Sequence, residues 1–295
     1  MTAIRRRHPL WVPWFYLAPF ILVQIVFTAY PLAQSVLLST QQTYGPKTSA
    51  FVGLSNFRNL ADDPLFWTAV TNTLYYTAGS LVIELPLALG IAVLLNQPWV
   101  RGRVLFRLVV FSPSLVGMAF VAILFVPIFA KNVGLLNVFL HNIWPRFNPE
   151  FGWNEEYVIW GLIVASLWMY TGINMLYFLA ALQNVDADLV DAAKIDGAGP
   201  WGRFRHVTLP AIWPVMTFVV LLSLIGSFQI FELPFILQNF GGGPDNRGLT
   251  IVLYLYQIGF ESGDLGYASA IGWCLAVLLV VLAIWHRRLI RRYEV

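Results

Sequence analysis

The sequence predicts an all-α integral membrane protein, a bundle of six transmembrane helices with both termini in the cytoplasm. Composition is the first reason, since 58% of the 295 residues are hydrophobic and only 11% are charged, against roughly a quarter charged in an ordinary soluble domain. The second reason is that six apolar stretches can each cross a bilayer core of ~30 Å, which takes about 20 helical residues. Because lipid offers no hydrogen-bond partners, each span must satisfy its own backbone as a helix.

The six predicted spans form a single transmembrane domain across residues 1–295. The first span follows Arg5, Arg6 and Arg7 and is longer than the roughly 7–15-residue core of a cleaved signal, so we expect an uncleaved signal anchor. Prolines inside later spans predict kinks or breaks, because proline lacks the donor that a helix needs; these are Pro86, Pro113, Pro127 and Pro234. The spans are residues 14–38, 71–95, 104–129, 158–182, 209–237 and 267–285.

Basic residues predict the orientation. Thirteen of the 18 Lys and Arg residues fall before the first span, between spans two and three or at the start of span three, between spans four and five, or after span six. Basic residues gather on the cytoplasmic side of membrane proteins. Both termini are therefore expected in the cytoplasm.

Several function classes are disfavoured by what the sequence contains. The single cysteine, Cys274, allows no internal disulfide, and a formal charge of +3 gives little reason to expect a nucleic-acid partner. The three lysines follow Pro46, Ala130 and Ala193, whereas a Walker A loop needs Gly-Lys-Ser/Thr. We expect no catalytic residue, metal or cofactor in this chain, so any ATP and Mg²⁺ belong to a partner ATPase.

Residues 186–210, between the fourth and fifth spans, predict two short helices joined by a glycine elbow. Three aspartates, Asp186, Asp188 and Asp191, suit the positive end of a first helix. Gly197 is typical of a helix end, and Pro200 of the first turn of a second helix. On these grounds alone, a docking element for a partner and an ordinary interhelical loop both remain open.

The same residues carry a resemblance to a known family. Asp191-Ala192-Ala193, three residues, Gly197, nine residues, Val207, one residue, then Leu209-Pro210 resembles the cytoplasmic signature of binding-protein-dependent ABC importer permeases. That signature has Glu and Ile where this chain has Asp191 and Val207. Other segments look like the carbohydrate-uptake branch, in particular the larger membrane subunit of maltose-type transporters; these are 14–20, 53–57, 180–183 and 241–244.

The resemblance implies a transporter of several subunits in the plasma (inner) membrane of a prokaryote. Two non-identical permease chains would form the pathway, two cytoplasmic ATPase subunits would drive it, and an extracytoplasmic sugar-binding protein or lipoprotein would deliver the sugar. A coupling helix in residues 186–210 would dock on an ATPase. The coupling residues would be Asp188, Asp191, Ala192, Ala193, Asp196, Gly197, Leu209 and Pro210.

Two ionisable residues inside spans, Glu84 and Glu232, are candidate functional groups because charge is costly in lipid. Helical spacing predicts that Phe228, Gln229 and Glu232 share one face, where a ring and polar oxygens would suit a sugar. Helix pairing by Glu232 and simple packing of Phe228 are the alternative. For Glu84 we expect a bundle-internal hydrogen bond near the Pro86 kink.

The resemblance places Phe228, Gln229 and Glu232 on one wall of the maltose permease's sugar site. It places Ser166, Met169, Tyr170 and Ile173 on the other wall. Apart from Arg107, at the start of the third span, no Lys or Arg lies inside the spans, and an anionic substrate would usually require a fixed cation. A neutral mono- or oligosaccharide is therefore expected.

A stand-alone secondary carrier for a small polar solute is the alternative function. Its carboxylates could relay protons, but the sequence contains no self-similar halves or thirds. An intramembrane enzyme would need paired catalytic residues. The four histidines, at positions 8, 141, 206 and 286, lie at or beyond span ends without metal-like spacing.

Overall fold

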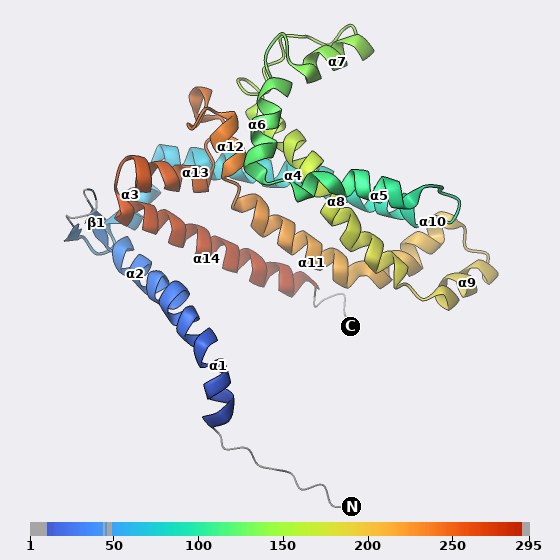
Figure 1. Ribbon diagram of the computed structural model, residues 1–295, viewed down its shortest axis with the longest axis horizontal. Coiled ribbons are helices and arrows are strands. Elements are labelled where there is room, and N and C mark those ends of the chain that lie inside the picture. The colour runs from blue at the N-terminus through green and yellow to red at the C-terminus, as the bar shows by residue number, and fades with distance from the viewer. Residues whose placement is uncertain (1–10, 44, 46–48, 291–295) are drawn as a thin grey trace, which may run out of the picture. The chain divides into compact units, whose positions relative to one another are not determined.

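The computed structural model describes residues 11–43, 45 and 49–290, which are mostly helical (Figure 1). The chain divides into two compact units. Unit 1 comprises Met1–Asp62 and Leu255–Cys274, and unit 2 comprises Asp63–Tyr254 and Leu275–Val295. Some basic residues that enter the orientation prediction lie outside the described residues, namely Arg5, Arg6, Arg7, Lys47, Arg291 and Arg292.

Unit 1 begins with one long helical run and a small β-hairpin. The run consists of α1 (Trp11–Gln24), a π-helical turn (Ile25–Ala29) and α2 (Tyr30–Ser39). Its most apolar 18-residue stretch has no buried residue within this chain, so lipid or another subunit must cover these side chains. Strands β1 (Gln41–Thr43) and β2 (Ser49–Phe51) then pair antiparallel, with Gln42 opposite Ala50, before α3 (Ser55–Ala61).

The hairpin of unit 1 is tied to the start of α14 (Leu265–Ile290). The Thr43 hydroxyl donates to Asp264 Oδ1 at 3.1 Å and accepts from the Gly266 N–H at 3.0 Å. A Cβ at position 266 would overlap the Gln41 carbonyl oxygen, so only glycine permits this approach. The buried Asn56 amide donates to the carbonyl oxygens of Ser39 and Gln41 at 3.0 and 2.8 Å.

Unit 2 is built around the pair α4 (Pro64–Asn96) and α8 (Val158–Gln183), which lie side by side (Figure 1). Small side chains on α4 take part in this packing, since Ala88 and Ala92 are fully buried in one cluster with Met175 and Phe178 of α8. Such residues let helix backbones approach closely, as packing in a membrane requires. A Cβ at Gly172 of α8 would overlap the backbone of α5, so that approach too depends on glycine.

The other elements of unit 2 precede or follow these two helices along the chain. In chain order they are α5 (Arg103–Phe111), a 3₁₀ turn (Ser112–Leu115), α6 (Met118–Ile128), α7 (Leu135–Ile143), α9 (Ala187–Ile195), α10 (Pro200–Arg203), a π-helical turn (Phe204–Thr208), α11 (Leu209–Phe228), α12 (Glu232–Leu237), a 3₁₀ turn (Pro244–Asn246) and α13 (Ile251–Tyr256). A π-helical turn (Gln257–Glu261) follows α13 and belongs to unit 1.

Five helices are long and apolar enough to cross a membrane within the described part of the chain: Trp14–Ser39, Pro64–Leu95, Val158–Gln183, Pro200–Leu237 and Leu265–Arg288. The predicted third span is not one helix. Its two halves, Arg103–Leu115 and Met118–Ile128, meet at 99°, with Pro113 in the 3₁₀ turn before the bend. If this bent pair is one span, the structure has the six that the sequence predicts.

The connection between α6 and α8 is organised by one buried amide. Asn137 of α7, with 0% exposure, donates to the carbonyl oxygens of Pro149 and Phe151, both at 2.9 Å. It also accepts from the Trp153 indole N–H at 2.6 Å. Near the two ends of this connection, an exposed hydrogen bond from Lys131 to the Glu155 carboxylate raises the pKa of Lys131.

Candidate functional site

A cavity of about 250 Å³ lies inside unit 2, between α4, α8 and the α11–α12 region. Its polar wall combines three tyrosines, two carboxylates, two amides and two serines. The lining residues are Tyr76, Glu84, Met118, Tyr170, Ile173, Asn174, Tyr177, Leu222, Ser223, Gly226, Ser227, Gln229, Ile230 and Glu232.

A break between α11 and α12 shapes one wall of this cavity. Helix α11 ends at Phe228, and α12 starts at Glu232. Pro234 has no N–H to donate to the Ile230 carbonyl, which a continuous helix would require. The buried Thr250 hydroxyl donates to the Ile230 carbonyl oxygen instead, at 3.1 Å, so the break leaves no orphaned acceptor there.

The break corrects the prediction that Phe228, Gln229 and Glu232 share a helical face. That spacing holds only along a continuous helix, and residues 229–231 are not helical. Gln229 and Glu232 nevertheless both line the cavity. Phe228 does not line it, and its side chain is 2% exposed in the helix packing.

On α8, the structure divides the four predicted residues into two pairs. Tyr170 and Ile173 line the cavity. Ser166 and Met169, one turn earlier, are buried at 0% and 8% exposure and are not among the lining residues. The Ser166 hydroxyl donates to the Ile163 carbonyl oxygen at 2.9 Å, which occupies it within its own helix.

Glu84 makes the bundle-internal hydrogen bond that the sequence predicts, and it also lines the cavity. Its Oε1 accepts from Asn174 Nδ2 at 2.5 Å, and Asn174 Nδ2 also lies 3.4 Å from Ser223 Oγ. Helix α4 continues through Pro86 without a break. Sequence reasoning gave Glu84 no place in the site, because its partner is 90 residues away.

The chemistry of the cavity suits a polyhydroxylated molecule. The tyrosine rings offer flat apolar faces, and the amides, hydroxyls and carboxylates can bond hydroxyl groups. None of the residues that line it is Lys, Arg or His, whereas Glu84 and Glu232 are acidic. Anions would therefore meet only negative or neutral groups.

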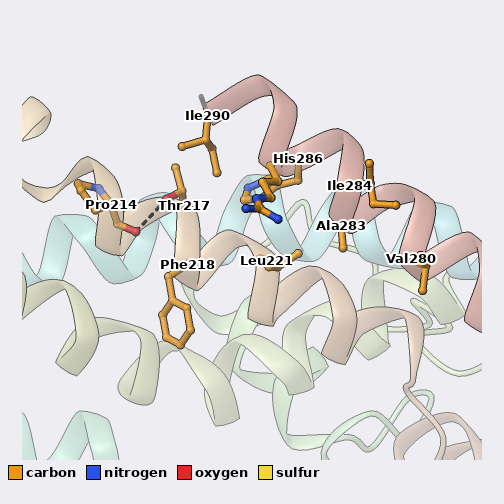
Figure 2. Close-up of a pocket in the computed structure, with 10 residues that line it drawn as sticks. Pro214, Thr217, Phe218, Leu221, Val280, Ala283, Ile284, His286 and Ile290 are labelled. Atoms are coloured by element: carbon orange, nitrogen blue, oxygen red, sulfur yellow. Dashed lines mark hydrogen bonds between the residues drawn. The ribbon is translucent and has the colours of Figure 1, made fainter. Parts of the chain in front are cut away.

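A larger groove of about 650 Å³ in the same unit lies between α11 and the second half of α14. Figure 2 shows mainly apolar side chains along it, among them Leu221, Val280 and Ile284. The Thr217 hydroxyl already donates to the Pro214 carbonyl oxygen at 2.8 Å. This groove has few groups that could bond a sugar, so the smaller cavity is the better candidate.

The segment 186–210 forms the two short helices that the sequence predicts. The Asp186 carboxylate caps α9 by accepting from the Asp188 N–H at 2.9 Å. Gly197 follows α9 with a φ of +81°, the left-handed conformation that glycine adopts without strain. Helix α10 begins at Pro200 and leads through a π-helical turn into α11 at Leu209-Pro210.

Helix α9 presents its side chains outward and buries none of them. Asp188, Asp191, Ala192, Asp196 and Gly197 are exposed, and Ala193 is half-buried. The apolar Ile195 and Trp201 are 88% and 70% exposed. The segment therefore combines an acidic, small-residue helix with uncovered apolar side chains, which is typical of a surface that meets a partner.

Comparison with known proteins decides the family. Residues 84–295 match the family described as the binding-protein-dependent transport system inner membrane component. The chain belongs to this family. The resemblance identified from the signature is thus confirmed, and the protein is a membrane permease component that works with a binding protein and partner subunits.

The permease resembles several characterised chains. The arabinooligosaccharides transport system permease protein AraP of Bacillus subtilis (strain 168) is 38% identical over 275 residues, which are 92% of this chain and 86% of that protein. The lactose transport system permease protein LacF of Rhizobium radiobacter is 35% identical over 274 residues, 92% of this chain and 91% of that one. The fold matches a chain of a bacterial ABC transporter involved in the import of the acidic polysaccharide alginate, with a TM-score of 0.83 and 23% identity over 96% of each chain.

Proposed function

We propose that this permease forms half of the translocation pathway of an ATP-driven importer for a neutral mono- or oligosaccharide. The observation that carries the proposal is the cavity, where Tyr170, Ile173, Gln229 and Glu232 line a space between α8 and the broken α11–α12 region. Such breaks within a bundle free backbone and polar side chains for solute binding. The sugar names of the AraP and LacF relatives support the same substrate class.

Within this proposal, Glu232 is the main polar anchor for the sugar hydroxyls. It begins α12 at the break, and its carboxylate can accept two or more hydroxyl hydrogen bonds. Tyr170 supplies a ring for the C–H face of the sugar. Phe228, Ser166 and Met169 act one layer behind the wall, where their burial fixes the positions of the residues that touch the substrate.

The charge of the cavity supports a neutral substrate. Two acidic side chains and no basic ones line it, so an anionic substrate would lose solvation without gaining a counter-charge from this chain. The alginate transporter imports an acidic polysaccharide, but its likeness to this permease, at 23% identity, concerns the fold.

We also propose that α9 docks on a cytoplasmic ATPase. Its exposed face, its capped start and its glycine end give a rigid, small-residue helix that can enter a partner's groove. Helix α10 and the π-helical turn then connect it to α11, so a movement of α9 would be transmitted to the wall of the cavity. Two such ATPases, with ATP and Mg²⁺, and a second, non-identical permease would complete the importer, with both termini in the cytoplasm.

The test is purification of the tagged chain from its native membrane, with mass spectrometry of its stoichiometric partners. The complex is then reconstituted in proteoliposomes with its binding protein, and ATP-dependent uptake is measured for arabinotriose, lactose and the anionic sugar trigalacturonate. We expect an ATPase, a second permease and uptake of a neutral sugar only. Uptake of trigalacturonate alone, or a homogeneous chain that carries solute without an ATPase, would contradict the proposal.

A variant pair sharpens the test. Glu232→Gln keeps the size of the side chain and removes its charge, and we expect neutral-sugar uptake to fall roughly tenfold as a charge-assisted hydrogen bond is weakened. Glu261→Gln changes an exposed carboxylate elsewhere and is the matched control, expected to transport like the wild type. Equal uptake by both variants would remove Glu232 from the site.

A further inference from the structure

A hydrogen-bonded chain of three side chains crosses the cavity wall and joins three helices. Glu84 lies on α4, Asn174 on α8 and Ser223 on α11, and all three line the cavity. Asn174 Nδ2 donates to Glu84 Oε1 at 2.5 Å and lies 3.4 Å from Ser223 Oγ. Glu84 and Asn174 are 5% and 6% exposed, so little water competes for these bonds.

The arrangement occupies one end of the Asn174 amide and leaves the other available. An asparagine amide has two N–H donors on Nδ2 and one carbonyl acceptor, Oδ1. Both partners, Glu84 Oε1 and Ser223 Oγ, lie against Nδ2. No group among the described residues donates to Asn174 Oδ1 at hydrogen-bond distance. The carbonyl oxygen is therefore the part of this amide that a bound molecule can use.

Glu84 also fixes which way round the amide sits. Rotating the Asn174 amide by half a turn would bring its carbonyl oxygen against the Glu84 carboxylate. Two acceptors would then face each other with no hydrogen between them, and the buried N–H groups of the amide would lose their partner. Ser223 alone could not impose this choice, because a hydroxyl both donates and accepts. The carboxyl group of Glu84 is thus what orients the amide.

We propose that Glu84 is a positioning residue for substrate selection, which holds Asn174 with its carbonyl oxygen available to accept a hydrogen bond from a sugar hydroxyl. This inference rests on the proposed sugar-import function. It adds a second polar contact, on the α4–α8 side of the cavity, to that of Glu232 on α12. It also predicts selectivity: a sugar whose contacting hydroxyl is methylated offers no hydrogen and is bound less tightly.

Sugar binding to the purified full complex in nanodiscs tests the proposal, with radiolabelled lactose and arabinotriose as probes and no binding protein present. We expect Glu84→Leu to raise the Kd roughly tenfold, the loss of one oriented hydrogen bond. Asn174→Ala should raise it by a similar factor, and the double variant should bind no more weakly than Asn174→Ala. Glu84→Gln keeps an acceptor oxygen but adds an N–H group that can hold the amide either way round, so its Kd should lie between those of the wild type and Glu84→Leu.

Several outcomes would overturn the inference. An unchanged Kd in Glu84→Leu, or losses that multiply in the double variant, would mean that Glu84 does not act through Asn174. If Glu84→Leu does not assemble, Asn174→Ala carries the test, because it leaves Glu84 in place; an unchanged Kd in Asn174→Ala would mean that the amide does not contact the sugar. Failure of the wild-type complex to bind either sugar would instead overturn the proposed substrate class, and this inference with it.

Discussion

Position 197 offers a sharp test of the proposal that α9 docks on an ATPase, because the backbone conformation alone requires glycine at this position. Its φ is +81°, and a Cβ added there would meet no atom within 4 Å in this chain. Gly197→Ala therefore creates no clash and adds only the cost of a left-handed conformation, about 1–2 kcal/mol for an L-residue. That cost falls on an exposed helix that buries no residue of its own.

The magnitude translates directly into binding. A change of 1–2 kcal/mol shifts an equilibrium by a factor of roughly 5–30, so the ratio of folded to unfolded ends of α9 falls by that factor in the free permease. If α9 must be folded to dock, we expect the affinity for the ATPase to fall by up to the same factor. Gly197→Asn should lose less, because asparagine tolerates the left-handed region.

Gly199→Ala is the matched control. It is the same substitution two residues away, also with no atom within 4 Å, but Gly199 has a φ of −65°, which alanine adopts without strain. The assay is titration of the purified ATPase onto the nanodisc-embedded permease, with ATP-dependent sugar uptake as the second measurement. Equal affinities for Gly197→Ala and Gly199→Ala would refute the reasoning.

Three further predictions concern packing and polar contacts in unit 2. Gly172→Ala should lower the free energy of unfolding by about 1–3 kcal/mol, because its Cβ overlaps the backbone of α5. Gly90→Ala has open space around it and should not lower it; equal melting temperatures for the two variants would contradict this. Asn137→Leu should lower the free energy of unfolding by ~3 kcal/mol, because it leaves two carbonyl oxygens and an indole N–H without a partner. Limited proteolysis should then cut residues 130–157 faster; an unchanged rate would show that the amide does not hold this segment. Tyr254→Phe removes the hydrogen bond to the Asp63 carboxylate, for about 1–2 kcal/mol, measured by thermal unfolding; no shift would show that solvent replaces the bond.

Local properties of the sequence determined most of the fold. Apolar length predicted the spans, because a helix is the way an isolated segment satisfies its backbone in lipid. The acidic start, the glycine end and Pro200 predicted α9 and α10, since caps depend on residues within one turn. The signature in residues 191–210 likewise identified the family from adjacent residues.

The tertiary structure decided the composition of the cavity. Pro234 predicted a distortion of the fifth span, but not where the span would break. The break between α11 and α12 depends on Thr250, which donates to a carbonyl oxygen 20 residues away in the chain. That break separates Glu232 from the face of Phe228. Likewise, Glu84 belongs to the site only because α4 and α8 pack closely enough to bring Asn174, 90 residues later, into hydrogen-bond contact.

The physical reason is the range of the interactions involved. Hydropathy, capping and glycine conformation act within a few residues, so the sequence by itself determined most of the apolar spans and the two short helices of residues 186–210. Which polar side chains meet inside a bundle depends on how helices far apart in the chain cross and where they break. The resemblance already indicated Tyr170, Gln229 and Glu232 as wall residues. The tertiary structure decided that Glu84 and Asn174 join them and that Phe228 does not.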